Sequence, residues 1–321
     1  MVVNVVRNYG FPDFFRQSPD GKGVWENVTF VLDSNRDHDL LICLNPPNKK
    51  IFTRIPKENR WLLTQEPPPI IDAQNQISVF DYFGKIFTQK NLANCENIQT
   101  ALPWHVNMNF DELCHQNVPS KRYEISTITS NLDTYEGQKT RIEFLNYLEK
   151  SGVAFNRYGK GVNYLRYKEK GLSPFKYSIC IENSFYPNYW TEKIADSFLC
   201  YTMPIYAGCP NIADYFPSRS MILIDLNDFE KSKDLILKSI KDQVWEKNLD
   251  AIVQARELVL FKYQFYPWMV SLIKKHFSGQ TKKLDRPEII PATKIVKGGM
   301  KARAKFYAKK IKKTFFYHLH S

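Results

Sequence analysis

The sequence predicts an α/β protein that is built from two successive units, each with a mainly parallel sheet. Short runs of β-type residues alternate with helical patterns along most of the chain. Several of these runs, such as residues 40–44, are continuously apolar, as expected for strands that are covered on both faces. A break at 117–121 separates one such series from the next, and 321 residues suffice for two domains of ~150 residues each.

The expected elements follow this division. In the first series we expect strands near 28–33, 39–44, 61–65 and 85–89. In the second we expect strands near 122–128, 153–158, 177–181, 203–207 and 221–225, with helices near 137–150 and 191–199 and further helix over 228–261. The predicted domains are therefore 1–120 and 121–275, followed by a tail over 276–321.

Composition excludes several classes of protein. Hydrophobic residues make up 43% of the chain and aromatic residues 14%, which is enough to fill real cores and excludes a wholly disordered chain. No apolar run reaches the ~18 residues of a membrane-spanning helix. Arg7 and Pro12 interrupt the beginning of the chain before a signal-peptide core can form, so we expect a cytoplasmic protein. The six cysteines form no CxxC pair, and neither a disulfide framework nor a zinc site is expected.

The net charge of +12 is concentrated at the end of the chain. Residues 294–321 carry nine Lys or Arg and no acid, which leaves +3 on all other residues. Six apolar or small residues recur there at helical spacing: Met300, Ala304, Tyr307, Ala308, Ile311 and Phe315. We expect a basic amphipathic helix that binds an anionic membrane surface. A solvated tail is the alternative; a nucleic-acid partner is not expected, because the rest of the chain shows no nucleic-acid motif.

The densest group of chemically informative residues lies within 175–217, which reads as strand, polar loop, helix, strand and tight turn. Thr191 can cap the helix, and Glu192 and Lys193 then occupy its first turn. The helix dipole disfavours a cation at this end. A bound anion such as a diphosphate would explain Lys193, and an ionised Glu192 could accept hydrogen bonds from ribose hydroxyls. An ordinary surface Thr-Glu-Lys cap explains the tripeptide equally well.

The whole stretch resembles glycosyltransferase family 10 of the bacterial type, the α1,3/α1,4-fucosyltransferase family. Its matching elements are Glu182-Asn183-Ser184, Tyr189-x-Thr191-Glu192-Lys193 and Pro204-Ile-Tyr-x-Gly208-x-Pro210-Asn211-Ile212 through Tyr215-Phe216-Pro217. The resemblance extends from about Ile125 to Asp228, is weaker around Glu66, and is absent from the first fifty residues. It implies a GT-B fold: two Rossmann-like domains that face a central cleft, the C-terminal one binding GDP-fucose.

The resemblance also implies roles for single residues. Its donor-binding set in this sequence is Ser130, Arg141, Asn183, Tyr189, Glu192 and Lys193. Glu192 would hold the ribose, and Lys193 would contact the diphosphate. Arg141 would clamp the diphosphate, since a guanidinium can donate to two phosphate oxygens and the departing GDP gains negative charge. Taken alone, Arg141 would be an ordinary surface arginine of a helix.

Glu66 is the expected catalytic base. The resemblance implies inversion by direct displacement, in which a carboxylate of the N-terminal domain takes the proton of the acceptor hydroxyl. Glu66 follows the predicted strand at 61–65 and precedes three prolines, which we expect to bar a helix and to hold it at the strand end. An exposed loop glutamate is the alternative. Asp72 and Asp81 are weaker candidates because they lack this placement.

Two other groups are weaker candidates for a functional site. Asp37-His38-Asp39 has the pattern of a metal-binding DxD motif, but it precedes a strand instead of following one, so we expect solvated side chains there. His105 could touch the acceptor, although a packed histidine between the domains is the preferred interpretation.

The sequence and the resemblance together predict an inverting fucosyltransferase. It would move L-fucose from GDP-fucose to a hydroxyl of an oligosaccharide or glycolipid, in α1,3 linkage, with no cofactor and no metal. The expected acceptor is a surface glycan that contains N-acetylglucosamine or galactose, such as lipopolysaccharide O-antigen, and the expected location is the inner face of a bacterial membrane. A transferase for another GDP-hexose and a non-catalytic, membrane-tethered saccharide-binding protein are the alternatives.

Overall fold

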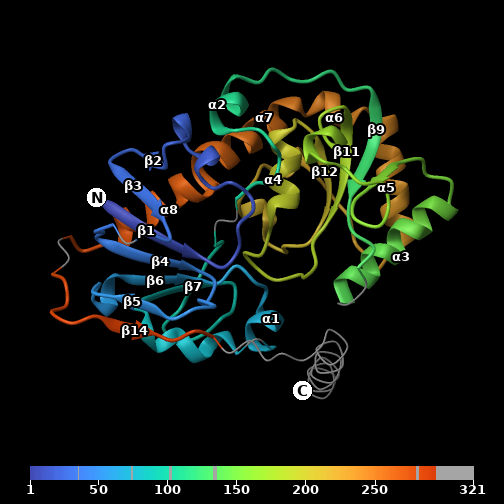
Figure 1. Ribbon diagram of the computed structural model, residues 1–321. Helices are drawn as coiled ribbons and strands as arrows, with labels where there is room; N and C mark the ends of the chain where they lie inside the picture. Colours follow the sequence, from blue (N-terminus) through green and yellow to red (C-terminus); the bar gives the residue numbers. More distant parts are fainter. Residues whose placement is uncertain (35, 74, 101–102, 133–135, 280–281, 294–321) are drawn as a thin grey trace, which may run out of the picture.

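The structure, a computed structural model, describes residues 1–321 except 35, 74, 101–102, 133–135, 280–281 and 294–321. Two α/β units lie side by side, and the strands of the first sheet run towards the second unit (Figure 1). The two-unit α/β architecture predicted from the sequence is confirmed. The predicted basic amphipathic helix of the tail lies outside the described residues.

The first sheet has seven strands in the order β2-β3-β1-β4-β6-β7-β8, all parallel except for the antiparallel pair β2·β3. They span β1 (Val2–Arg7), β2 (Val24–Trp25), β3 (Val28–Leu32), β4 (Leu40–Leu44), β6 (Arg60–Leu63), β7 (Lys85–Thr88) and β8 (Glu96–Asn97). The four strands predicted in this half are present. The sequence analysis missed β1, a central strand whose polar Asn4 interrupts the apolar pattern that marks a buried strand.

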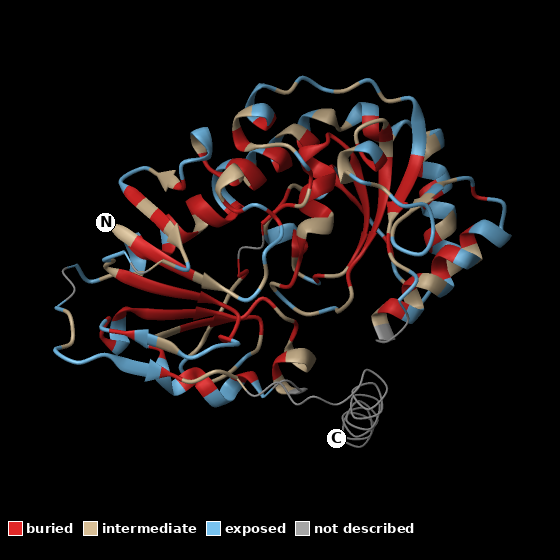
Figure 2. Cartoon of the chain, viewed as in Figure 1, coloured by how far each residue is buried: buried red, intermediate tan, exposed pale blue. Residues whose placement is uncertain are grey.

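The second sheet has five parallel strands in the order β10-β9-β11-β12-β13. They span β9 (Tyr123–Ile128), β10 (Asn156–Tyr158), β11 (Phe175–Ile181), β12 (Met203–Ala207) and β13 (Ile222–Leu223). All five strands predicted in this half are therefore present. Every residue of β12 is buried, and so is every residue of β11 except Lys176, as parallel strands require (Figure 2).

The helices lie mainly in the second half of the chain. They are α1 (Pro68–Ala73), α2 (Phe110–His115), α3 (Glu136–Lys150), α4 (Glu192–Leu199), α5 (Phe229–Lys241), α6 (Val244–Lys247), α7 (Leu249–Leu258) and α8 (Phe265–His276), with a π-helical turn, η8 (Val259–Tyr263), between the last two. Short 3-10 helices are η1 (Phe15–Gln17), η2 (Pro19–Gly21), η3 (Lys57–Asn59), η4 (Gln76–Tyr82), η5 (Lys168–Gly171), η6 (Ile212–Asp214) and η7 (Ser218–Ser220).

The end of the chain returns to the first unit. Helix α8 lies within the predicted C-terminal domain, but Phe265, Met269 and Ile273 pack in one apolar core with Val5 and Trp61 of the first sheet. Beyond α8, strand β14 (Glu288–Ile290) pairs antiparallel with β5 (Ile51–Thr53). The structure thus differs from the expected division, in which residues 121–275 form one unit and 276–321 a separate tail. A π-helical turn leads directly into α8, and this crossing carries no composition break that a sequence could show.

Among the residues that the structure describes, no helix is both long enough and apolar enough to cross a membrane.

Candidate functional site

A buried carboxylate, Glu182, lies at the centre of the candidate site. It follows the last residue of β11, at the carboxyl edge of the second sheet, where open parallel sheets bind their ligands. Its side chain is fully buried and accepts hydrogen bonds from the backbone N–H and hydroxyl of Thr191 at 2.8–3.0 Å. Gly208 leaves the space that this requires, since a Cβ there would lie 2.5 Å from Glu182 Cγ.

Helix α4 begins against this carboxylate. Thr191 caps the helix as predicted, with its hydroxyl accepting from the Lys193 N–H. Lys193 Nζ lies 3.1 Å from Glu182 Oε2 and 3.1 Å from the Thr191 hydroxyl. The anion that explains a lysine at this helix end is therefore supplied by the chain itself. One ammonium proton remains, and 19% of the side chain is exposed, so Lys193 can still contact a ligand.

Arg141 approaches from α3 and is 4% exposed. Its Nη1 donates to Asn183 Oδ1 at 2.8 Å, and its Nη2 to the Ser130 carbonyl at 3.5 Å. Ser130 and Asn183, both predicted to line the donor site, therefore hold the guanidinium in place. Nε of Arg141 has no partner among the described residues, although it is buried. An unpaired buried donor of this kind is costly unless a ligand accepts its hydrogen bond.

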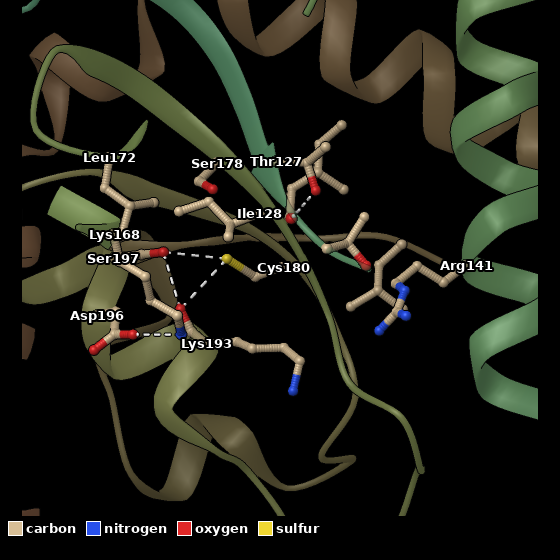
Figure 3. Close-up of a pocket in the computed structure, with 13 residues that line it drawn as sticks. Thr127, Ile128, Arg141, Lys168, Leu172, Ser178, Cys180, Lys193, Asp196 and Ser197 are labelled. Carbon is tan, nitrogen blue, oxygen red and sulfur yellow. Dashed lines mark hydrogen bonds and ion pairs between the residues drawn. The ribbon is translucent and has the colours of Figure 1, made fainter. Parts of the chain in front are cut away.

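The two cations border one pocket. Figure 3 shows the Lys193 ammonium and the Arg141 guanidinium pointing towards the same space from opposite sides. The pocket is lined on one side by the strand residues Thr127 and Ser178 and on the other by Ser197 of α4. The hydroxyls of Thr127 and Ser197 already donate to backbone carbonyls. The pocket therefore contributes mainly the two cations at the carboxyl edge of the sheet.

Glu192 faces three groups that hold it ionised. Its Oε1 lies 3.5 Å from Lys168 Nζ, 3.8 Å from His105 Nδ1 and 3.9 Å from Lys193 Nζ. Burial alone would raise the pKa of Glu192, but the charges of Lys193 and Lys168 outweigh burial and hold that pKa well below its ordinary value. The resulting carboxylate can accept hydrogen bonds from hydroxyl groups.

Asp196, one turn further along α4, fixes the connection between the units. It is 1% exposed and accepts from the backbone N–H groups of His105 and Val106 at 2.7 and 3.2 Å, and from Lys168 Nζ at 2.8 Å. His105 is held between the units, with its ring centroid 5.4 Å from that of Phe11. This packing agrees with the preferred interpretation of His105. Phe11 itself is 64% exposed, so an aromatic face borders the space between the units.

The loop before α4 ties the second unit to the first. The amide of Asn188, which adopts φ +63°, donates to the backbone and side-chain oxygens of Asn97 in β8. Its backbone N–H donates to Asn211 Oδ1, while Asn211 Nδ2 and the Tyr215 hydroxyl donate to its side-chain oxygen. Asn211 and Tyr215 belong to the sequence pattern that carried the resemblance. Part of that pattern therefore serves to hold the loop.

Glu66 stands at the facing edge of the first sheet. It comes three residues after the end of β6, and its neighbour Gln65 is fixed by Asn45 and by the Tyr9 hydroxyl. Burial raises the pKa of Glu66, and its side chain has no ion-pair partner in the described part of the chain. Glu66 is close enough to raise the pKa of Tyr189, in the second unit, which burial already raises.

The expectation that the prolines bar a helix after Glu66 is wrong. Helix α1 begins at Pro68, two residues after Glu66. Proline fits the first turn of a helix, because its missing N–H would have no intrahelical partner there. Glu66 therefore lies in a short connection between a strand and a helix, which still places it at the carboxyl edge of the sheet.

The weaker candidates lie elsewhere. Asp72 forms an ion pair with Lys90, and Asp81 is exposed on η4. Asp39 accepts from the Val2 N–H and Asp37 pairs with Lys283, both at the amino edge of the first sheet. Within the described residues, no group of three His, Cys, Asp or Glu side chains is placed to hold a metal ion.

Three charged groups of the site received no role in the sequence analysis: the buried Glu182 and Asp196 and the half-buried Lys168. Glu182 was part of the quoted pattern. Asp196 lies one helical turn after Glu192, so the two share a face of α4, and this spacing could have identified it. Lys168 begins the short helix η5 and carries no local signal.

Solved glycosyltransferases share this fold of two α/β units. The crystal structure of an alpha1,3-fucosyltransferase with GDP-fucose superposes with a TM-score of 0.52, covering 88% of this chain and 92% of that chain at 21% identity. An alpha-glucosyltransferase in complex with UDP and a 13-mer DNA superposes with a TM-score of 0.51, covering 85% of this chain and 98% of that chain at 10% identity. At these identities the likeness concerns the fold alone.

Sequence comparison finds a family model that matches part of the chain. Residues 118–244 match glycosyltransferase family 10 (fucosyltransferase) C-term. The similarity to this family therefore lies in the second unit and covers less than half of the chain.

Two curated relatives are similar over short regions. Alpha-(1,3)-fucosyltransferase FucT of Helicobacter pylori is 37% identical over 70 residues, which are 22% of this chain and 15% of that protein. The 4-galactosyl-N-acetylglucosaminide 3-alpha-L-fucosyltransferase 9 of Mus musculus is 29% identical over 126 residues, 37% of this chain and 33% of that protein. The matches thus span at most a third of the length of these relatives.

Proposed function

We propose that this protein is an inverting α1,3-fucosyltransferase that transfers L-fucose from GDP-fucose to a hydroxyl of a saccharide acceptor. The observation that carries the proposal is the convergence of Arg141, Lys193 and Glu192 at the carboxyl edge of the second sheet, within the region that matches family 10. Similarity to relatives named as α1,3-fucosyltransferases supports the choice of donor and linkage.

The proposed chemistry uses residues of both units. The diphosphate of GDP-fucose accepts hydrogen bonds from Arg141, whose Nε is unpaired among the described residues, and from the free proton of the Lys193 ammonium. Both cations stabilise the negative charge that GDP gains as it leaves. Glu192 accepts hydrogen bonds from the ribose hydroxyls, and Tyr189 closes the donor side next to Glu66.

Glu66 is the proposed general base. Its carboxylate takes the proton of the acceptor hydroxyl while that oxygen forms a bond to C1 of fucose. The bond from C1 to the phosphate oxygen breaks on the opposite face, and GDP leaves with the electron pair. A carboxylate with a raised pKa and no cation beside it is a stronger base than an ion-paired one, which favours Glu66 over Asp72.

Calorimetric titration of GDP, GDP-fucose, GDP-mannose and UDP-galactose tests the donor site. We expect binding of the GDP ligands only, strongest with GDP-fucose and lost in Arg141→Ala/Lys193→Ala. The matched control is Arg219→Ala/Lys238→Ala, which removes two exposed cations of the same unit. Equal binding of UDP-galactose would contradict the assignment, and preference for GDP-mannose would favour the alternative of another GDP-hexose.

The proposed acceptor site rests on an exposed aromatic ring between the units. The exposed ring of Phe11 packs beside His105, which lies 3.8 Å from Glu192, and it offers an apolar face on which a sugar ring can stack. We propose a surface glycan containing N-acetylglucosamine or galactose, such as lipopolysaccharide O-antigen. Transfer to such oligosaccharides, followed with and without EDTA, also tests the expectation that no metal is needed. If no sugar is transferred and Glu66→Gln leaves saccharide binding intact, the non-catalytic saccharide-binding alternative replaces the transferase.

We also propose that the protein works at the cytoplasmic face of a membrane, which it binds through its tail. Nine Lys or Arg and no acid in 294–321 support this placement, because each cation near an anionic surface contributes ~1 kcal/mol. Loss of binding to anionic vesicles when the basic residues of the tail are replaced by serine would support it.

A further inference from the structure

The ribbon formed by β5 and β14 carries an apolar pair on its outer face. Phe52 and Ile289 are cross-strand partners, 67% and 46% exposed. Their neighbours Ile51 and Ile290 point inward, where Ile290 is fully buried. These two large apolar side chains form a small contiguous apolar patch, and exposed apolar patches rimmed by polar residues can mark an interaction surface.

The surroundings of this pair are strongly basic. Residues 48–58 and 282–290 carry seven Lys or Arg against three Asp or Glu: Lys49, Lys50, Arg54, Lys57, Lys282, Lys283 and Arg286, against Glu58, Asp285 and Glu288. Glu288 is already used by the buried Arg60, 2.7 Å away. Lys283 is paired with Asp37, which leaves six cations close to the ribbon in sequence. Exposed apolar side chains with cations near them suit an anionic lipid surface.

The tail begins beside this ribbon. Thr293, three residues after β14, is fixed to the Pro47 carbonyl by its backbone N–H and its hydroxyl, both at 2.8 Å. The next 28 residues carry nine cations and no acid. The tail and the ribbon therefore repel each other, as two copies of the ribbon would, which argues against either as the occupant of this face.

We propose that the outer face of the β5·β14 ribbon docks on an anionic bilayer, with Phe52 and Ile289 inserted at the interface and the surrounding cations at the lipid headgroups. The proposal extends the membrane association proposed for the tail: a folded surface then sets the orientation of the protein on the membrane. It does not depend on the donor or on the chemistry of the active site.

Sedimentation with vesicles of phosphatidylcholine containing about 30% phosphatidylglycerol tests the proposal on the full chain, since anionic lipid is what the cations should recognise. We expect Phe52→Ser/Ile289→Ser to weaken binding about tenfold or more. The control Leu223→Ser/Leu237→Ser, which changes two similarly exposed residues of the other unit, should bind like wild type. Wild-type binding by the ribbon variant would overturn the proposal, and a melting temperature and circular dichroism spectrum like those of wild type verify that the variant is folded.

A second variant reports insertion directly and keeps an apolar residue in the ribbon. Phe52→Trp should show blue-shifted emission with these vesicles and quenching by brominated lipid beyond that of wild type. An unshifted, unquenched signal from the introduced tryptophan would contradict insertion. Replacing Lys309, Lys310, Lys312 and Lys313 by serine separates the two membrane proposals: loss of binding in this variant alone supports the tail only, and loss in the ribbon variant alone supports the ribbon only.

Discussion

At the scale of single residues, Glu66 and Glu192 show how the surroundings assign different roles to the same side chain. Glu192 faces Lys168 and Lys193, so it stays ionised and its basicity is low. Glu66 is half-buried without a cation, so its pKa rises. A pair of carboxylates whose pKa values are moved in opposite directions suits one for binding and the other for proton transfer.

Glu66→Gln should lower turnover by ~10²-fold or more, because the acceptor hydroxyl loses its base. GDP-fucose affinity should stay close to that of wild type, since Glu66 is assigned to the acceptor side. Initial rates and calorimetry measure the two effects. A fall in donor affinity that equals the fall in turnover would move Glu66 out of the proposed role.

The pH dependence of Glu66 has a definite sign. Its pKa is raised in the folded protein, so ionising it at neutral pH costs folding free energy. Glu66→Gln should therefore increase the free energy of unfolding at neutral pH, and the gain should vanish as the pH falls below the ordinary glutamate value. For wild type, the acid limb of the rate profile should lie above that ordinary value. Urea unfolding at several pH values, and the rate profile itself, check both statements.

Phe11→Ala should raise KM for the saccharide acceptor with little change in KM for GDP-fucose, because the exposed ring is proposed to stack on the acceptor. Phe11→Tyr keeps the aromatic face and serves as the control. If both variants behave like wild type, the acceptor does not contact this ring.

At the scale of elements, the site depends on how closely β11, β12 and α4 approach one another. Glu182 directly follows β11, and Gly208 directly follows the neighbouring strand β12, so the two residues lie against each other. The Glu182 carboxylate then receives the first residues of α4. One buried acid thus positions the helix end that carries Glu192 and Lys193.

Gly208→Ala should destabilise the protein by about 1–3 kcal/mol, as overpacking of a dense interior does. The added Cβ would lie 2.5 Å from both Glu182 Cγ and the Tyr206 hydroxyl oxygen. Donor affinity should fall as well, because Lys193 is held by Glu182. Gly10→Ala, whose Cβ meets nothing within 4 Å, is the control for thermal unfolding. An unchanged melting temperature for Gly208→Ala would contradict this packing.

At the scale of the whole molecule, contacts across the two units hold the proposed donor site next to Glu66. Asp196 accepts from the connecting segment at His105, and Asn188 binds Asn97 of the first sheet. Helix α8 packs on the first sheet although it follows the second in sequence. The chain thus crosses between the units twice, which restricts how they can move apart.

Stability at acid pH should reflect Glu192. Its folded-state pKa is below the ordinary value of 4.5, so its contribution to stability is present above that value and is lost as the pH falls through the folded pKa. Glu192→Gln should flatten the dependence of the unfolding free energy on pH below 4.5. Asp242→Asn, which removes a surface pair with Lys238, should change it little. Parallel curves for Glu192→Gln and wild type would contradict the assignment.

The sequence by itself determined the alternation of strands and helices, the cap at Thr191 and the region that matches the family. These features are local: apolar runs, a capping residue and a dense pattern within some forty positions are visible without knowing the fold. The second sheet was predicted in full for this reason. Strand β1 was not predicted because the polar Asn4 lies within it. Helix α1 was not predicted because prolines were expected to bar a helix, whereas a proline can begin one.

Only the tertiary structure decided which residues meet. It paired Lys193 with Glu182, and it placed Asn183 and Ser130 where they hold Arg141. It brought Lys168 of η5, which is distant in sequence, to Glu192 and Asp196. It also returned α8 and β14 to the first unit and placed Phe52 beside Ile289 on an outer face. Contacts between residues far apart in the chain depend on how sheets and helices pack, and no local spacing encodes them.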